Sequence, residues 1–90
     1  METMAFHAIH PGLILKEELE AVDWYDQRVE ATDDESLAAV LAHNRDEEKE
    51  HAAMLIEWLR RHDRVLEGNL RTYLFTSAPV TEIEAESTAG

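Results

Sequence analysis

The chain has 90 residues, enough for one small domain, and a chain of this length buries only roughly 60–65% of the surface that its unfolded form exposes. Twenty acidic residues against eight basic ones give a formal net charge of −12, which argues against nucleic acid as a partner and in favour of cations. The sequence contains no cysteine, so disulfides, thiolate metal sites and thiol redox chemistry are excluded. No stretch resembles a secretion signal or a membrane span, and we therefore expect a cytoplasmic protein.

The first predicted element is a helix over residues 11–31. Residues 1–10 carry little pattern and are expected to form a flexible leader, whereas Pro11 suits the first turn of a helix. Apolar residues then recur at helical spacing as far as Val29. The segment Thr32-Asp33-Asp34-Glu35 fits a capping box, in which Thr32 covers the backbone N–H of Glu35 and a new helix begins.

The rest of the chain predicts a long second helix, a short third helix and a tail. The second helix should run from Glu35 to residue 61 or 63, antiparallel to the first. Asp63 is placed to cap a third helix with an apolar stripe. Residues 76–90 are acidic with little to bury, which predicts a mobile tail. We thus expect an all-α fold, an antiparallel helical hairpin plus a short third helix, with the helical domain at residues 11–75.

Glu48 and His51 stand out because helical phase places both on the apolar stripe of the second helix. Glu-x-x-His puts a carboxylate and an imidazole one turn apart, the inward-pointing spacing of di-iron carboxylate bundles. On the first helix, Glu18 faces along the apolar stripe with Tyr25 below it. Neither stripe is expected to offer a basic partner, so a metal ion is the predicted partner of Glu18, Glu48 and His51.

One hairpin offers only half of a carboxylate-bridged pair of metals, which in four-helix bundles takes a Glu from each of two helices and Glu-x-x-His from each of two others. A two-fold axis would present Glu18, Glu48 and His51 twice, so we expect the metal pair to lie between two chains. The alternative is an ordinary solvated helix face, on which Arg45 and its charged neighbours form weak i,i+3 and i,i+4 pairs. Spacing alone leaves both interpretations open.

A second acidic group lies on the opposite face of the first helix, where Glu17 and Glu20 are one turn apart beside Trp24. Two carboxylates next to an aromatic side chain can guide cations or line a subunit contact. A solvated face with one exposed tryptophan accounts for the same spacing. Met54 and Trp58 on the second helix are more typical of a core or a subunit contact than of a cofactor site.

Three blocks in order give a resemblance that goes beyond spacing. They are KEELEAVDWY at residues 16–25, HNRDEEKEHA at residues 43–52 and YLFT at residues 73–76. Over residues 15–79 the chain resembles the encapsulated ferritins, the ferritin-like ferroxidase cargo of bacterial and archaeal encapsulin compartments. The resemblance implies half of a ferritin-like four-helix bundle, completed by dimerisation, with the homodimers assembled into a ring of five, a decamer.

The resemblance also implies the chemistry of the main site. Fe(II) would be oxidised to Fe(III) at a di-iron centre between two subunits, with Glu18, Glu48 and His51 as its ligands. Tyr25 would be a further catalytic residue close to the metals. The ring would enclose no mineral cavity, so the oxidised iron would leave for mineralisation and storage elsewhere in the compartment.

Further roles follow from the same resemblance. Glu17 and Glu20 match metal-entry positions with Trp24 beside them, and Glu47 and Glu50 are candidates for an additional site that takes calcium or another divalent cation. The encapsulin shell protein would be the partner. The last residues, 87–90, differ from the short apolar peptide with which members of that family dock on the shell, so either the chain is truncated or its targeting differs.

We therefore predict a ferroxidase, an iron oxidoreductase that is active only as an oligomer, within an encapsulin nanocompartment in the cytoplasm. The main alternative is a non-catalytic acidic helical module with a structural metal site, which would dimerise through Leu37, Leu41, Leu55 and Leu59. A third interpretation is a di-iron peroxidase or oxidase with an organic substrate, for which the sequence shows no pocket.

Overall fold

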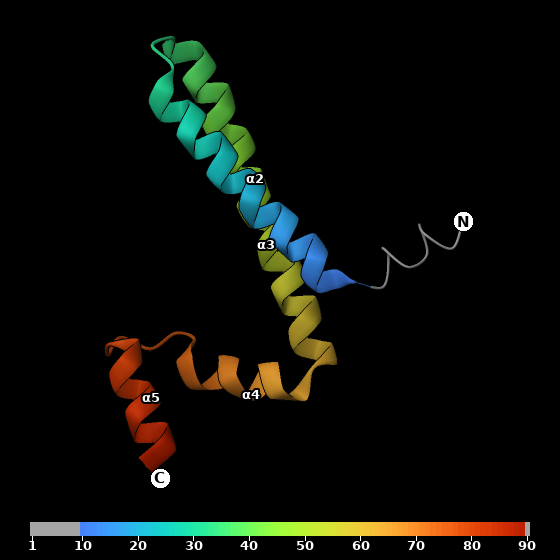
Figure 1. Cartoon of the computed structure of the whole chain (residues 1–90), viewed down its shortest axis with the longest axis vertical. Coiled ribbons are helices and arrows are strands. Elements are labelled where there is room, and N and C mark those ends of the chain that lie inside the picture. Colours follow the sequence, from blue (N-terminus) through green and yellow to red (C-terminus); the bar gives the residue numbers. More distant parts are fainter. Residues whose placement is uncertain (1–9, 90) are drawn as a thin grey trace, which may run out of the picture. The chain divides into compact units, whose positions relative to one another are not determined.

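The computed structural model describes residues 10–89, and the regular structure in this part is entirely helical. Figure 1 shows four helices, which are α2 (Pro11–Ala31), α3 (Glu35–His62), α4 (Arg64–Tyr73) and α5 (Val80–Ala89). The all-α prediction is thus confirmed. The chain forms two compact units, Met1–Trp58 and Leu59–Gly90, whose boundary falls within α3. The leader predicted at residues 1–10 lies outside the described residues apart from its last one, and the domain limits of 11–75 stay a prediction.

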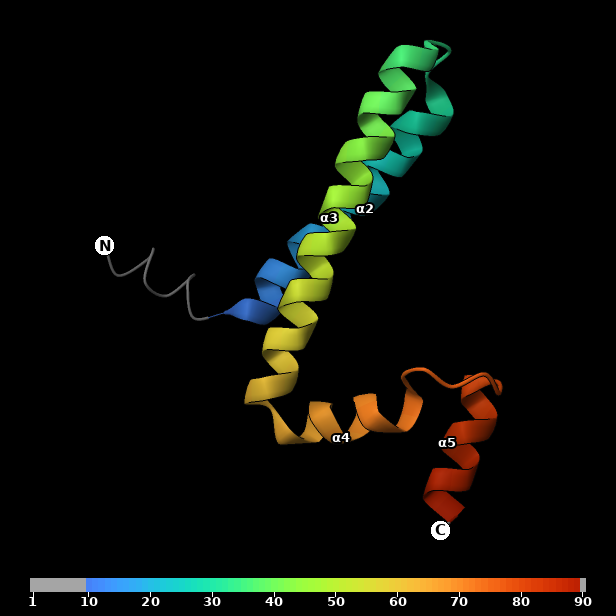
Figure 2. The same cartoon turned by 180° about the vertical axis from the view of Figure 1, so that it is seen from behind.

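In the first unit, α2 and α3 run antiparallel and lie side by side in both views (Figures 1 and 2). The bounds predicted for the first helix agree with α2, which has Pro11 in its first turn. The helix ends at Thr32, whose backbone is extended and whose N–H donates to the carbonyl of Arg28 at 3.1 Å. A local signal at each end therefore sets the length of α2, and the sequence pattern was sufficient to find it.

The turn between the helices differs from the predicted capping box. Asp34 Oδ1 accepts hydrogen bonds from the backbone N–H groups of Ser36 at 3.0 Å and Leu37 at 3.1 Å, so Asp34 caps α3. The Leu37 amide, followed by the Ser36 hydroxyl and amide, holds the pKa of Asp34 below its usual range. Thr32 Oγ1 instead accepts from the Asp34 N–H at 3.2 Å. A carboxylate is favoured at this position because its charge complements the positive end of the helix dipole.

Packing in the hairpin is thin. Of the residues that the structure describes, Ala52 is the one that is fully buried, with 5% of its surface exposed. Several of the half-buried residues on α3 are small, as at Ala38 and Ala42. Large apolar side chains remain exposed on both helices, among them Leu19, Trp24, Leu37, Met54 and Trp58. Because water contacts so much apolar surface, we expect a protein partner to cover part of it.

The second unit contains α4, which begins as predicted. Asp63 caps it by accepting a hydrogen bond from the Leu66 N–H at 3.0 Å. Glu67 accepts from the guanidinium groups of Arg60 at 2.7 Å and Arg71 at 3.4 Å. These contacts, with Arg71 contributing most, hold the pKa of Glu67 below its usual range. The ion pairs tie the last turn of α3 to α4 within this unit.

Residues 80–89 form α5, a further helix within the segment for which the sequence predicted a mobile tail. The carbonyl of Pro79 accepts from the N–H groups of Glu82 at 3.0 Å and Ile83 at 3.1 Å, which starts the helix. Glutamate and alanine are good helix formers, and this local preference outweighs the shortage of apolar residues. The mobility of the segment stays a prediction. Within residues 10–89, no helix combines the length and the apolar character needed to cross a membrane.

Candidate metal centre

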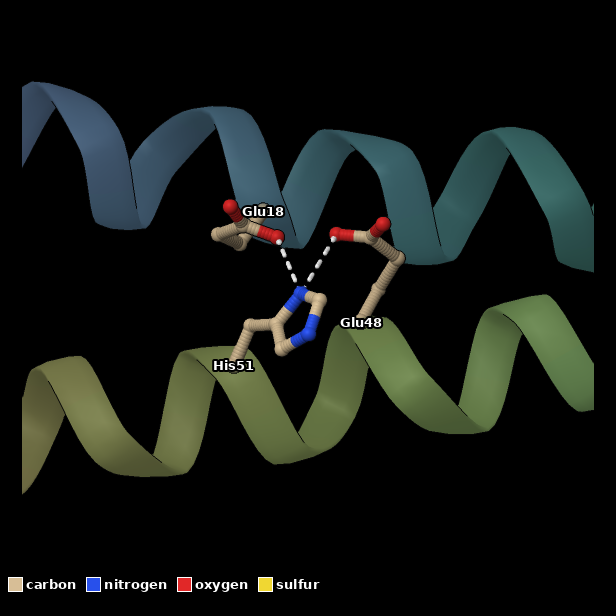
Figure 3. A group of neighbouring side chains, drawn as sticks. All are labelled: Glu18, Glu48 and His51. Atoms are coloured by element: carbon tan, nitrogen blue, oxygen red, sulfur yellow. Dashed lines mark ion pairs between the residues drawn. The ribbon is translucent and has the colours of Figure 1, made fainter.

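Two helices of the first unit bring three potential ligands together (Figure 3). Glu18 comes from α2, and Glu48 and His51 lie one turn apart on α3. Each offers one ligand atom, and the three atoms lie within 4.8 Å of one another. His51 Nδ1 is 3.5 Å from Glu18 Oε2 and 3.7 Å from Glu48 Oε2. The structure thus joins the residues that helical phase singled out, and metal binding by them stays a prediction.

The cluster lies at the edge of the hairpin. The side chains of Glu18 and Glu48 are each 23% exposed, whereas that of His51 is 48% exposed. His51 is therefore less buried than its position on the apolar stripe predicted. The physical reason is that a hairpin of two helices covers only part of each stripe. One side of the cluster is consequently open.

The two carboxylates destabilise each other. Glu18 Oε2 is buried and has no hydrogen-bond donor, although His51 lies nearby. The pKa of Glu18 is raised, first by the hydrogen bond that its protonated form can share with Glu48, then by burial and by the negative charge of Glu48. His51 opposes this rise. A bound cation would remove the conflict, because it favours the ionised form of both carboxylates.

Arg45 corrects the expectation that no basic residue lies on the inner stripes. It is half-buried on α3, one turn before Glu48. Its guanidinium donates to Asp26 of α2 at 2.8 Å and to Asp46 at 3.1 Å. The sequence placed Arg45 among surface pairs, although its phase with Glu48 and Ala52 was a signal that it faces α2. Both carboxylates that Arg45 contacts, those of Asp26 and Asp46, thus lie outside the cluster.

The donor set fits a hard or intermediate metal ion. Carboxylate oxygens and an imidazole nitrogen suit iron, manganese and zinc, whereas soft ions prefer sulfur. An ion of this kind takes roughly four to six ligands in proteins. Glu18, Glu48 and His51 supply three of them. The remaining ligands must come from water or from another chain.

An apolar groove adjoins the open side of the cluster. Its volume is about 360 Å³, and it is lined by Ile14, Glu18, His51, Met54, Leu55 and Trp58. Met54 is 66% exposed and Trp58 is 47% exposed. An exposed methionine and tryptophan beside an incomplete ligand set are better matched by a protein surface than by water.

The other residues of the first helix that were singled out lie outside the cluster. Tyr25 is two turns from Glu18, roughly 10 Å along α2, and its ring meets that of Trp24 edge-on with a centroid distance of 5.0 Å. The guanidinium of Arg28 lies 3.7 Å from the centre of the Trp24 ring. Glu20 Oε1 is 3.6 Å from the ammonium of Lys16. The predicted roles of Tyr25 and Trp24 near a metal stay predictions.

The remaining acidic candidates are exposed. Glu17 and Glu50 face solvent, and Glu47 Oε1 is 2.9 Å from Nε2 of His43. Among residues 10–89, Glu18, Glu48 and His51 are the one group of three such side chains whose ligand atoms converge. A cation held by Glu17 and Glu20, or by Glu47 and Glu50, would therefore need ligands from elsewhere.

Replacing Glu18 by glutamine should stabilise the metal-free protein, because it removes one of two charges that repel each other. The expected gain is of order 1 kcal/mol at neutral pH, measured by thermal unfolding in the presence of a chelator. Since the pKa of Glu18 is raised in the folded state, the folded protein binds this proton more readily than the unfolded chain. Stability from this group should therefore rise as the pH falls through the raised pKa, and Glu18→Gln should abolish that rise.

Glu30→Gln is the matched control, since Glu30 is exposed on the same helix. It removes the same charge without touching the cluster and should leave the unfolding temperature nearly unchanged. A lower unfolding temperature for Glu18→Gln than for Glu30→Gln would contradict the repulsion between Glu18 and Glu48.

The hairpin with two carboxylates and an imidazole between its helices defines a ferritin-like all-α protein with a candidate metal centre. The model of the EncFtn-like family matches residues 2–77, and the chain belongs to that family. The encapsulated ferritin-like protein of Rhodospirillum rubrum is 70% identical over 74 residues, which are 82% of this chain. The ferritin-like protein of Thermotoga maritima is 62% identical over 76 residues, 84% of this chain.

A more distant relative and a solved structure are also similar to this chain. The encapsulin nanocompartment cargo protein EncC of Myxococcus xanthus is 43% identical over 69% of this chain. The crystal structure of protein ne0167 from Nitrosomonas europaea is 57% identical, with a TM-score of 0.77 over 88% of this chain and 85% of that one. The chain spans 53% of the Rhodospirillum relative, 57% of the Myxococcus relative and 67% of the Thermotoga relative. The resemblance to encapsulated ferritins is thus confirmed.

Proposed function

We propose that the protein is a ferroxidase that oxidises Fe(II) to Fe(III) at a di-iron centre formed between two chains. The observation that carries the proposal is the convergence of Glu18, Glu48 and His51 within 4.8 Å, with a buried Glu18 oxygen that has no hydrogen-bond donor. Membership of the EncFtn-like family supports iron as the metal. In this proposal iron is the substrate.

The second chain follows from the incomplete ligand set. A two-fold axis beside the open edge of the cluster would place two copies of Glu18, Glu48 and His51 around a pair of iron ions, as in a four-helix carboxylate bundle. The same axis would cover the groove that Met54 and Trp58 line. Burial of apolar surface and completion of the ligand set would thus favour the same homodimer. Dimers would assemble further into a ring, which by resemblance is a decamer.

Each ligand has a role in the reaction. The carboxylates of Glu18 and Glu48 neutralise the charge of the bound iron and favour Fe(III), which prefers anionic oxygen ligands. His51 supplies a neutral nitrogen and orients the ion. Dioxygen or peroxide accepts the single electron that each Fe(II) loses. Tyr25 would lie close to the iron in the dimer.

The acidic surface would supply the substrate. With a net charge of −12, the chain attracts cations, and Glu17 and Glu20 beside Trp24 would form an entry site. Glu47 and Glu50 would hold calcium or another divalent cation at a further subunit contact. Because two relatives carry names that link them to encapsulation, we propose that the protein is cargo of an encapsulin shell in the cytoplasm and supplies iron for storage there.

Iron stoichiometry and turnover, measured on the same sample, test the proposal. The protein is loaded with Fe(II) without oxygen, the bound iron is counted per chain, and Fe(III) formation is then followed by absorbance after air is admitted. We expect one pair of iron ions for every two chains and repeated turnover. Iron that binds without turnover would identify the alternative, a dimerisation module with a structural metal. A chain that binds no iron would exclude the ferroxidase.

A further inference from the structure

Among the described residues of the first unit, polar side-chain contacts join α2 to α3 at two places. One lies within the candidate metal centre, where His51 and Glu18 are 3.5 Å apart. The other is the ion pair of Arg45 with Asp26, whose nitrogen and oxygen are 2.8 Å apart. Arg45 is only 23% exposed, and it precedes Glu48 by three residues, roughly 4.5 Å along the helix axis. The shorter contact thus lies one turn from the cluster.

Apolar packing leaves the axial alignment of this hairpin weakly determined. Within residues 10–89, Ala52 is the one fully buried residue of α3, and its half-buried neighbours Ala38 and Ala42 are also small, so this surface has little to interlock. Apolar contact is also non-directional, so a small displacement of α2 along α3 changes its free energy little. The same displacement would separate Glu18 from the two ligands on α3. A directional contact is therefore needed to hold the ligands in register.

Repulsion between the carboxyl groups of Glu18 and Glu48 acts against that register before a cation arrives, since both side chains are little exposed. Arg45 does not touch either of them through a contact that the structure records, and its guanidinium is shared by Asp26 and Asp46. We propose that the Asp26–Arg45 ion pair is a positioning device, which aligns α2 and α3 so that the three ligands already converge in the metal-free chain. This inference rests on the proposed metal-binding function.

Cobalt binding to the full chain tests this inference without reference to iron oxidation. The visible absorbance of Co²⁺ gives a dissociation constant for each variant. Asp26→Asn removes the contact between the helices and should raise that constant roughly threefold to fivefold, the range that an exposed ion pair can supply. Asp46→Asn is the matched control. It removes the same charge and also one partner of Arg45, but its contact lies within α3, so its effect should stay below roughly twofold.

Rescue separates positioning from a general loss of stability. Arg45→Asp alone should weaken Co²⁺ binding, and the double variant Asp26→Arg with Arg45→Asp should restore it to within roughly twofold of the original chain. Added salt should also narrow the difference between Asp26→Asn and Asp46→Asn, because it screens the ion pair. If a single variant loses helicity, the double variant still tests the positioning role, because it contains both substitutions and restores the ion pair.

The outcomes distinguish this inference from the proposed function. Equal dissociation constants for Asp26→Asn and Asp46→Asn, or no rescue by the exchanged pair, would overturn the positioning role while the original chain still binds Co²⁺. Failure of the original chain to bind Co²⁺ through Glu18, Glu48 and His51 would overturn both.

Discussion

Alanine at position 51 should lower the rate of Fe(II) oxidation at least tenfold. His51 supplies the nitrogen ligand of the proposed centre, and its Nδ1 lies within 3.7 Å of both carboxylates. Loss of a group that merely supports a ligand already lowers metal affinity or activity by roughly 10–100-fold, so loss of a ligand should cost at least as much. Glu18→Ala and Glu48→Ala should have effects of the same size. The measurement is Fe(III) formation under air at equal protein concentration, with the uncatalysed rate subtracted.

Glu30→Ala serves as the control for these three variants, because it removes an exposed carboxylate from α2 outside the proposed site. Its rate should match that of the original protein. Residues that hold one metal centre act as a unit, so the double variant Glu48→Ala with His51→Ala should be little slower than either single variant. Unchanged rates in all three single variants would refute the assignment of the ligands.

Replacement of both Met54 and Trp58 by glutamine should weaken the proposed homodimer and lower the oxidation rate with it. Both side chains line the groove beside the cluster, and they are 66% and 47% exposed in the single chain, so polar substitutes should leave the hairpin folded. Truncation of an aromatic anchor at the centre of an interface typically costs about 2 kcal/mol or more, which corresponds to a dimer at least roughly 30-fold weaker. Light scattering over a range of protein concentrations measures this change.

Activity gives the second readout of this variant. At concentrations where light scattering finds only monomer, the variant should not oxidise iron, and a higher protein or metal concentration should restore both the dimer and the activity. Val40→Gln is the control, since Val40 is 57% exposed on α3 and does not line the groove. Full activity in a fraction shown to be monomeric would rule out a centre shared between two chains.

Local signals made the helices predictable. Pro11 favours the start of α2 through its own backbone geometry. Asp63 caps α4 by accepting a hydrogen bond from an amide only three residues away. The turn was predicted for the same reason, but its cap was assigned to Thr32, while Asp34 makes the hydrogen bonds. Several adjacent polar residues can serve as a cap, and the pattern of residue types does not say which of them points at the amides. The helix α5 was not predicted, because few apolar residues recur in residues 76–90.

Helical phase also placed Glu18, Glu48 and His51 on inward faces, because the period of a helix depends on the chain alone. The axial alignment of two helices decides which of their residues meet, and this alignment is set only when the helices pack against each other. The structure therefore decided that Arg45 pairs with Asp26 and that His51 remains half exposed beside the groove. The sequence by itself thus determined the family, the helices α2, α3 and α4, and the three candidate ligands. Only the tertiary structure decided the distances between these three residues, the exposure of His51 and the ion pair of Arg45 with Asp26, since these depend on atoms brought together from distant parts of the chain.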